Sequence, residues 1–146
     1  MQKIAVVGAG LMGHGIAQVF ALKGFSVSLT DISAEALDAG VENVRANLDL
    51  MADQGIIEKS AIGTALERIR TNVELEQAVD GADFVVEAVV ENLEIKQKIF
   101  KQLDSVCPQD VILATNTSVI SITEIAALTR HKSRVVGAHF WNPPYL

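Results

Sequence analysis

The sequence predicts an α/β domain built around a doubly wound parallel sheet. Short apolar runs alternate along the chain with segments of helical periodicity, and a glycine-rich turn joins the first run to the first helical segment. Strands that alternate with helices form parallel sheets covered on both faces. With 49% hydrophobic residues over 146 positions, the chain can bury one sizeable core, so we expect a single domain over residues 1–146.

The first β-α-β unit is expected over residues 3–30. Residues 3–7 form a short apolar run that ends at a glycine, which predicts a buried strand. Residues 12–23 carry apolar side chains at helical spacing and are followed by another glycine, which predicts a helix that stops there. Residues 25–30 alternate like a second strand.

A long helical arm is expected after the second strand. Ser33 can cap its first helix, and the helical pattern extends over residues 34–69, with a break near Gln54 and Gly55 and a restart around Ser60. This is far more chain than a simple crossover needs.

The rest of the chain continues the alternation. The expected elements are an amphipathic helix at 73–79, a central strand at 83–90, a helix at 93–103 capped by Asn92, a strand at 111–114, a helix at 122–128 and a last strand at 134–138.

The glycine-rich turn is the first candidate binding site. It has the pattern GxGxxG and consists of Gly8, Ala9, Gly10, Leu11, Met12 and Gly13. Because it leaves a buried strand and opens a helix, its backbone N–H groups and the positive helix end would face a pyrophosphate. A turn with merely structural glycines is the weaker alternative. The pattern therefore predicts a dinucleotide-binding Rossmann domain.

Asp31 indicates which dinucleotide is bound. It follows the second strand, 18 residues after Gly13, where a carboxylate can accept hydrogen bonds from both ribose hydroxyls. A 2′-phosphate there would face a like charge, and the next three residues supply no arginine. NAD is therefore expected rather than NADP.

Composition excludes several other classes of partner. A net charge of -6 would repel nucleic acid and anionic lipid, so neither a nucleic acid nor a membrane is expected. The single cysteine, Cys107, cannot form an intrachain disulfide, and the first residues lack a signal-peptide pattern. A cytoplasmic protein with a small-molecule substrate and no metal is expected.

Four motifs occur together in one order: GAGLMGHGIA at the glycine turn, VVEAVVENLEIK at 85–96, NTS at 116–118 and AHFWNP at 138–143. With these motifs the chain resembles the N-terminal NAD-binding domain of the 3-hydroxyacyl-CoA dehydrogenase family. The resemblance implies an oxidoreductase of fatty acid metabolism. Such an enzyme oxidises a 3-hydroxyacyl thioester to the 3-ketoacyl thioester and transfers a hydride to NAD.

The resemblance also implies roles for individual residues. His139 matches the catalytic acid/base, and Ser118 matches a residue that contacts both the substrate hydroxyl and the cofactor. Glu91, Lys96 and Asn142 match positions around the nicotinamide half of NAD. From the residues alone, Lys96 could also be a solvated surface lysine. His14 and His131 are expected to be exposed.

Two departures from the family leave alternatives open. The family's glutamate partner of the histidine and its helical C-terminal domain would lie beyond Leu146, so we expect NAD binding with little turnover and a homodimeric full-length parent. The arm is acidic where the family tends to be basic, and the segment NPPY at 142–145 resembles gulonate and carnitine dehydrogenases. A dehydrogenase of a non-CoA 3-hydroxy acid is therefore the second hypothesis, and a non-catalytic NAD-binding module the third.

Overall fold

The computed structural model describes residues 2–146 and contains one parallel sheet. Its strands are β1 (Lys3–Val7), β2 (Ser26–Thr30), β3 (Ile69–Thr71), β4 (Phe84–Glu87), β5 (Ile112–Thr115) and β6 (Val135–Gly137). The helices are α1 (Leu11–Leu22), α2 (Ala34–Asp53), α3 (Ser60–Glu67), α4 (Leu75–Val79), α5 (Leu93–Val106) and α6 (Ile122–Ile125), with 3-10 turns at Ala126–Leu128 and Lys132–Arg134.

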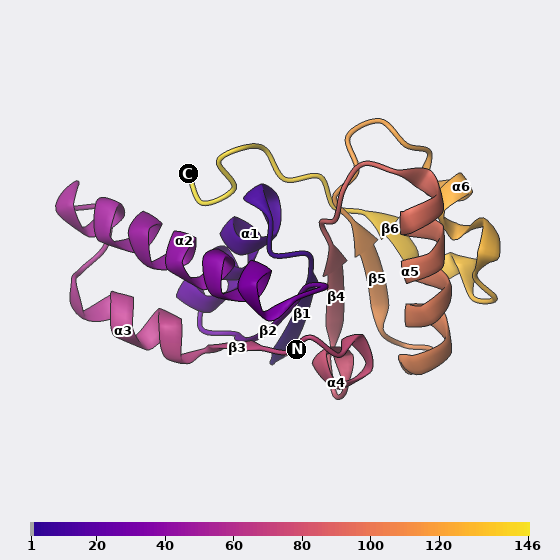
Figure 1. Cartoon of the computed structure of the whole chain (residues 1–146), viewed down its shortest axis with the longest axis horizontal. Helices are drawn as coiled ribbons and strands as arrows, with labels where there is room; N and C mark the ends of the chain where they lie inside the picture. Colours follow the sequence, from indigo (N-terminus) through magenta and orange to yellow (C-terminus); the bar gives the residue numbers. More distant parts are fainter. Residues whose placement is uncertain (1) are drawn as a thin grey trace.

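The strands lie in the order β3-β2-β1-β4-β5-β6, and every neighbouring pair is parallel. The chain first builds outward from β1 to β3 and then returns to place β4 on the other side of β1 (Figure 1). This reversal confirms the predicted doubly wound Rossmann fold, in which ligands bind outside the carboxyl ends of the central strands.

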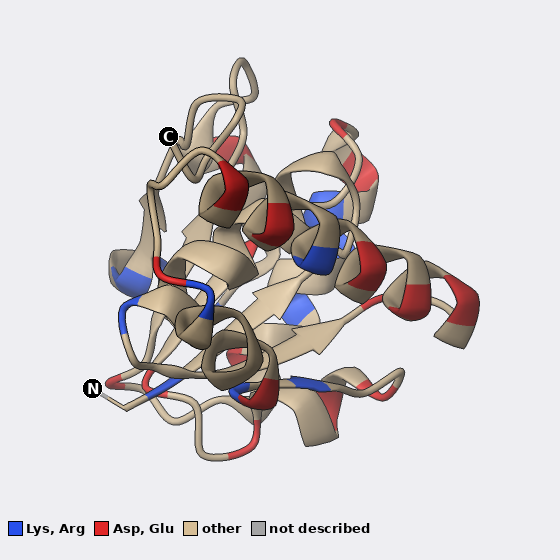
Figure 2. Cartoon of the chain, turned by 90° about the vertical axis from the view of Figure 1, so that its left-hand side faces the viewer, with Lys and Arg blue, Asp and Glu red and all other residues tan. Residues whose placement is uncertain are grey.

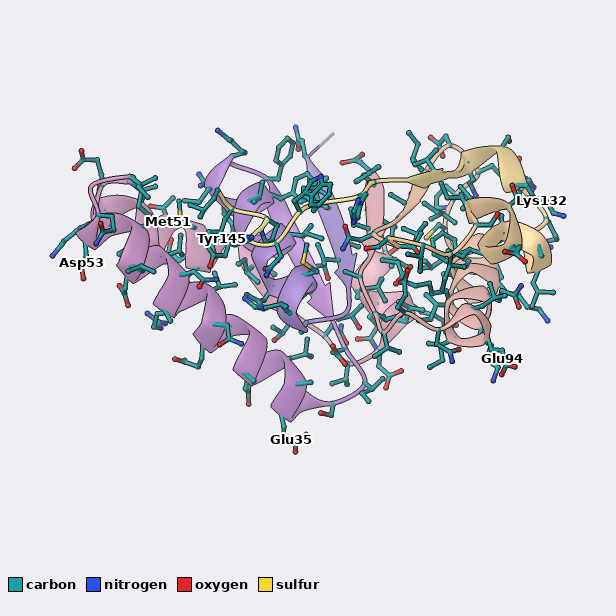
Figure 3. All side chains as sticks on the ribbon, turned by 90° about the horizontal axis from the view of Figure 1, so that it is seen from above. Glu35, Met51, Asp53, Glu94, Lys132 and Tyr145 are labelled. Atoms are coloured by element: carbon teal, nitrogen blue, oxygen red, sulfur yellow. The ribbon has the colours of Figure 1, made fainter. Side chains whose placement is uncertain are left out.

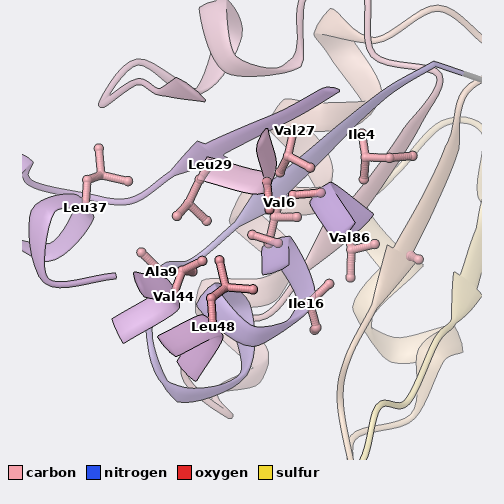
Figure 4. Packing of buried hydrophobic residues seen from close by; sticks show 14 residues of the cluster. Ile4, Val6, Ala9, Ile16, Val27, Leu29, Leu37, Val44, Leu48 and Val86 are labelled. Carbon is pink, nitrogen blue, oxygen red and sulfur yellow. The ribbon is translucent and has the colours of Figure 1, made fainter. Parts of the chain in front are cut away.

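Two apolar cores cover the two faces of the sheet. Ile4 and Val6 of β1 point into one core together with Ile16 of α1 and Leu48 of α2 (Figure 4). The alternate residues of β1 point into the other core, against Phe100 of α5. Because β1 is buried on both faces, its sequence is a continuous apolar run, as expected for a central parallel strand.

The predicted helical arm is present as α2 and α3, which extend beyond the sheet (Figure 1). The Ser33 hydroxyl caps α2 by accepting a hydrogen bond from the Ala36 N–H at 3.2 Å. The break falls at the predicted place, where Gly55 adopts a positive φ of 69°.

The end of the arm differs from the expectation. Ile69–Thr71 is not helical; it forms the edge strand β3, which pairs with Val27 to Leu29 of β2. Three residues, two of them exposed, are too few to show the alternation that identifies a strand.

Other boundaries also differ from the prediction: the helix expected at 93–103 continues to Val106, and the helix expected at 73–79 begins at Leu75. The strand predicted at 83–90 ends at Glu87, because the next residues turn away from the sheet after the Ala88 N–H donates to the Val7 carbonyl. The helix predicted at 122–128 is one α-helical turn followed by a 3-10 turn. The Asn92 cap of α5 is confirmed, since its side chain accepts from the Ile95 N–H at 3.0 Å.

The tail after β6 crosses α1 toward α2 (Figure 1). Tyr145 lies beside α2 (Figure 3), where its hydroxyl donates to Asn47 Oδ1 at 3.1 Å. Pro144 packs on Gly15 of α1, and a Cβ added at Gly15 would lie 2.4 Å from the proline ring. Within residues 2–146, no helix combines the length and the apolar character needed to cross a lipid bilayer.

Candidate active site

The predicted site residues follow the carboxyl ends of five strands. The glycine turn follows β1, Asp31 follows β2, Glu91 follows β4, Ser118 follows β5 and His139 follows β6. In a parallel sheet these ends meet at one edge. The fold therefore gathers residues that are more than 100 positions apart in the sequence.

The glycine turn has the geometry that a bound pyrophosphate needs. Gly8 has a φ of 103°, and a Cβ there would lie 2.7 Å from the Ala88 carbonyl oxygen. A Cβ at Gly13 would lie 1.7 Å from the Gly8 carbonyl oxygen, so strand and helix could not approach as closely. At Gly10, by contrast, an added Cβ would meet no other atom within 4 Å. Gly10 is the N-cap of α1 and offers no side chain to the first N–H groups of that helix, which leaves them for an anion.

Asp31 lies against this turn. Its Oδ2 accepts a hydrogen bond from the Ala9 N–H at 2.6 Å, and its Oδ1 accepts from the Ile32 N–H at 2.7 Å. Asp31 also lines a cavity of about 200 Å³, together with the apolar residues Ile32, Val73 and Val89. A ribose held by the carboxylate would place its base in this cavity. The turn, the acid and the cavity therefore fit an adenine dinucleotide.

His139 and Ser118 meet at the same edge. Ser118 Oγ lies 3.0 Å from His139 Nε2, within hydrogen-bond distance. Both residues are exposed, so a substrate can reach them. The His139 ring packs against Trp141, with 5.3 Å between the ring centroids. This arrangement can accept a proton from a hydroxyl group placed between the imidazole and the serine.

Glu91 holds the loop that carries Ser118. Its Oε1 accepts hydrogen bonds from the Thr117 hydroxyl, from the Ser118 N–H at 3.0 Å and from the Val119 N–H at 3.3 Å. Burial alone would raise the pKa of Glu91, but these hydrogen bonds and the nearby Lys96 ammonium lower the pKa to about 2. Glu91 is therefore ionised at neutral pH and fixes the loop by its charge.

Lys96 is not a solvated surface lysine. Only 1% of its side chain is exposed, and its ammonium group lies 2.7 Å from Glu87 Oε1 and 3.4 Å from Glu91 Oε2. Burial of a charge is costly unless the charge is paired, and here two carboxylates pair it. Lys96 lies beside Glu91, and the contact of Lys96 with the cofactor stays a prediction.

Asn142 lies in the exposed tail three residues after His139. The loop before it is fixed by Asn116, whose side-chain oxygen accepts from the Phe140 N–H at 2.7 Å. Asn116 lies in the NTS segment that follows β5. Its bond to Phe140 ties the segments that carry Ser118 and His139 to each other.

The other two histidines differ from the expectation. His14 is buried rather than exposed, because its Nδ1 lies 2.7 Å from the Gly10 carbonyl oxygen under the glycine turn. His131 is half-buried and lies 3.1 Å from Asp104 Oδ1, far from the sheet edge that carries His139. His14 thus lies beside the glycine turn, while His131 lies outside the candidate active site.

Sequence reasoning missed Glu87 and Thr117, which both contact the site residues. Glu87 had a visible signal: it is a charged residue within the apolar run FVVEAVV, and such a residue is rarely buried without a partner. Thr117 had none, because a threonine in a polar loop is ordinary. No cluster of three or more His, Cys, Asp or Glu side chains in residues 2–146 could hold a metal ion.

Comparison with known proteins agrees with this geometry. Residues 3–146 match the family model described as 3-hydroxyacyl-CoA dehydrogenase, NAD binding domain. A probable 3-hydroxybutyryl-CoA dehydrogenase of Bacillus subtilis (strain 168) is 43% identical over 143 residues, which cover 98% of this chain and 50% of the relative.

Two solved structures also have a backbone similar to that of this chain. The 3-hydroxybutyryl-CoA dehydrogenase of Escherichia coli K12 has a TM-score of 0.93 and 43% identity, over 98% of this chain and 30% of that one. A diketoreductase that acts on dicarbonyl compounds has a TM-score of 0.93 and 31% identity, over 100% of this chain and 52% of that one. The chain thus spans half of the Bacillus relative's length and about a third of the Escherichia coli structure.

Proposed function

Because this chain belongs to the 3-hydroxyacyl-CoA dehydrogenase family as its NAD-binding domain, we propose that it serves the oxidation of a 3-hydroxyacyl thioester to the 3-ketoacyl thioester. The observation that carries the proposal is the 3.0 Å contact between Ser118 Oγ and His139 Nε2, at the sheet edge that also holds the glycine turn. A module that only binds a cofactor needs the turn and Asp31 but not this pair.

The residues of the chain divide the work by position. The backbone N–H groups at the start of α1 hold the pyrophosphate, and the Asp31 carboxylate accepts hydrogen bonds from the ribose hydroxyls. Glu91, Lys96 and Asn142 surround the nicotinamide half. When bound, NAD supplies the acceptor for the hydride that leaves carbon 3 of the substrate.

His139 and Ser118 handle the proton. The Ser118 hydroxyl orients the 3-hydroxyl group of the substrate by a hydrogen bond, and His139 Nε2 accepts the proton of that hydroxyl as the carbonyl forms. An imidazole suits this role because it accepts and returns protons near neutral pH. In the reverse direction His139 returns the proton to the carbonyl oxygen.

A dehydrogenase of a non-CoA 3-hydroxy compound is the second candidate. The acidic arm favours this candidate. Helix α2 has five exposed acids and only one arginine, Arg45, and its net negative charge repels the phosphates of CoA. The resemblance in backbone to a diketoreductase, which acts on dicarbonyl compounds, also supports this candidate. Cytoplasmic location and a homodimeric full-length parent stay predictions.

The test compares substrates and variants in one assay of NADH formation. We expect residues 1–146 to reduce NAD only slowly with 3-hydroxybutyryl-CoA, and we expect His139→Gln to lower this slow rate further, toward the loss of about 10²- to 10⁴-fold that removal of a general base causes. His131→Gln is the matched control, since His131 contacts Asp104 instead. Reduction of NAD with free 3-hydroxybutyrate but not with the thioester would favour the second candidate. Equal rates for His139→Gln and wild type would refute the role of His139.

A further inference from the structure

Glu87 is the most deeply buried acid of the site, and neither the substrate nor NAD can touch it. Its side chain has no exposed surface, and it lies at the end of β4 between β1 and β5. A buried carboxylate is costly unless every oxygen is hydrogen-bonded, so its retention calls for a physical reason.

Both oxygens of Glu87 are bonded. Oε1 accepts from the Lys96 ammonium at 2.7 Å and from the Val89 N–H at 2.7 Å, and Oε2 accepts from the Thr115 hydroxyl at 2.7 Å. Glu87 therefore fixes three segments at once: the loop after β4, helix α5 through Lys96, and strand β5 through Thr115.

Lys96 connects the buried Glu87 to the more exposed Glu91. Its ammonium also lies 3.4 Å from Glu91 Oε2, while Glu91 Oε1 accepts hydrogen bonds from the Ser118 loop. Contacts thus run without a gap from Glu87 through Lys96 and Glu91 to Ser118, and from Ser118 Oγ to His139. The link between Lys96 and Glu91 is an ion pair at 3.4 Å, and the other links are hydrogen bonds, which fix orientation more strongly than apolar packing does.

We infer that Glu87 is a positioning residue: through Lys96 it fixes Glu91 and the 117–119 loop, and so shapes the place where the nicotinamide end of the cofactor lies. The inference rests on the proposed function, which puts that end of NAD beside Glu91 and Ser118. The inference does not concern the adenine end, which the proposed function assigns to Asp31 after β2 and to the glycine turn after β1.

The test separates the two ends of the cofactor by comparing NADH with ADP-ribose, which lacks the nicotinamide. Glu87→Gln keeps the shape of the side chain but removes the charge that pairs with Lys96. We expect the Kd for NADH to rise by about tenfold, the effect typical of a lost supporting contact, while the Kd for ADP-ribose changes by less than about twofold. Isothermal titration calorimetry measures both.

Asp104→Asn is the matched control, because Asp104 is another buried acid that pairs with Arg134 outside the site. This variant should lose stability but keep both affinities. The double variant Glu87→Gln, Lys96→Met removes both buried partners, so no buried charge is left unpaired; Glu91, which also loses the Lys96 ammonium, is 37% exposed. It should still bind NADH weakly and ADP-ribose normally.

Three results would overturn the inference. They are unchanged NADH binding by Glu87→Gln, an equal loss for NADH and ADP-ribose, or NADH binding at the wild-type level by the double variant. A different result bears on the proposed function itself: if wild-type protein binds NADH no more tightly than ADP-ribose, the nicotinamide is not held at this edge.

Discussion

Asp31 is tied to the glycine turn by the same carboxylate that is expected to hold the ribose. The bonds from the Ala9 and Ile32 N–H groups occupy one direction at each oxygen, and a carboxylate oxygen has a second lone pair to offer. The acid is thus held in place by the backbone while it can still accept from a ribose hydroxyl.

Replacement of Asp31 by asparagine should therefore weaken NAD binding. The amide keeps the shape but loses the charge, so we expect the Kd for NAD to rise by about tenfold or more, the effect of a lost hydrogen bond to a charged group. The preference for NAD over NADP should narrow, because the repulsion of a 2′-phosphate is removed. Calorimetric titration with both dinucleotides measures this.

Asp110→Asn is the control for Asp31, since this exposed acid precedes β5 at the opposite edge of the sheet. It should leave both affinities unchanged. Unaltered NAD binding by Asp31→Asn would remove Asp31 from the ribose site.

Among the elements, helix α2 contacts the glycine turn directly. Gly40 of α2 packs on Ala9, and a Cβ at Gly40 would lie 2.9 Å from the Ala9 Cβ and 3.0 Å from its carbonyl oxygen. The arm can therefore lie against the turn because this helical position has no side chain. The same helix receives the tail through Asn47.

Gly40→Ala should accordingly destabilise the protein and weaken NAD binding. The added methyl group forces α2 and the turn apart, which we expect to cost about 1 to 3 kcal/mol of unfolding free energy, as overpacking does. Gly63→Ala in α3 is the matched control: a Cβ there meets nothing within 4 Å, so the change should stabilise by about 0.5 to 1 kcal/mol. Urea unfolding of both variants gives the comparison, and a stabilised Gly40→Ala would contradict the packing argument.

The sequence predicted most elements because their signals are local. The apolar run of β1, the glycine turn and the Ser33 cap are each visible in a few residues. The edge strand β3 was missed because it is held by pairing with β2 rather than by a pattern of its own. The burial of His14 and Glu87 was also missed, since it depends on contacts with Gly10, Lys96 and Thr115 that only the fold creates.

On the scale of the whole molecule, two acids outside the apolar cores connect distant segments. Glu91 fixes the Ser118 loop, and Asp104 of α5 accepts from Arg134 Nη2 at 2.9 Å and from the Arg130 N–H at 2.7 Å. Burial would raise the pKa of Asp104, but these bonds and the charge of Arg134 lower the pKa to about 2. The pKa of Glu91 thus lies well below the ordinary value of 4.5, and the pKa of Asp104 lies well below the ordinary value of 3.8.

Stability should therefore fall in acid. Because folding lowers both pKa values, the contribution of Glu91 and Asp104 is fully present above pH 4.5 and is lost as the pH falls through about 2. The urea midpoint, measured from pH 6 to pH 2, should decline most steeply below pH 4.5. The double variant Glu91→Gln, Asp104→Asn should be less stable at pH 6 and should show a shallower decline; parallel curves for the two proteins would contradict this.

The acidic face of α2 has a kinetic consequence. Its exposed acids, Glu35, Asp38, Glu42, Asp49 and Asp53, form a row along the arm beside a single blue residue, Arg45 (Figure 2). Such a row repels an approaching polyanion over roughly the Debye length of 8 Å at physiological ionic strength. Added salt therefore speeds the encounter with a CoA thioester, whereas for a small, weakly charged hydroxy compound the arm is no barrier. The ionic strength of the surroundings should thus change the association rate of a CoA thioester more than that of a small hydroxy compound.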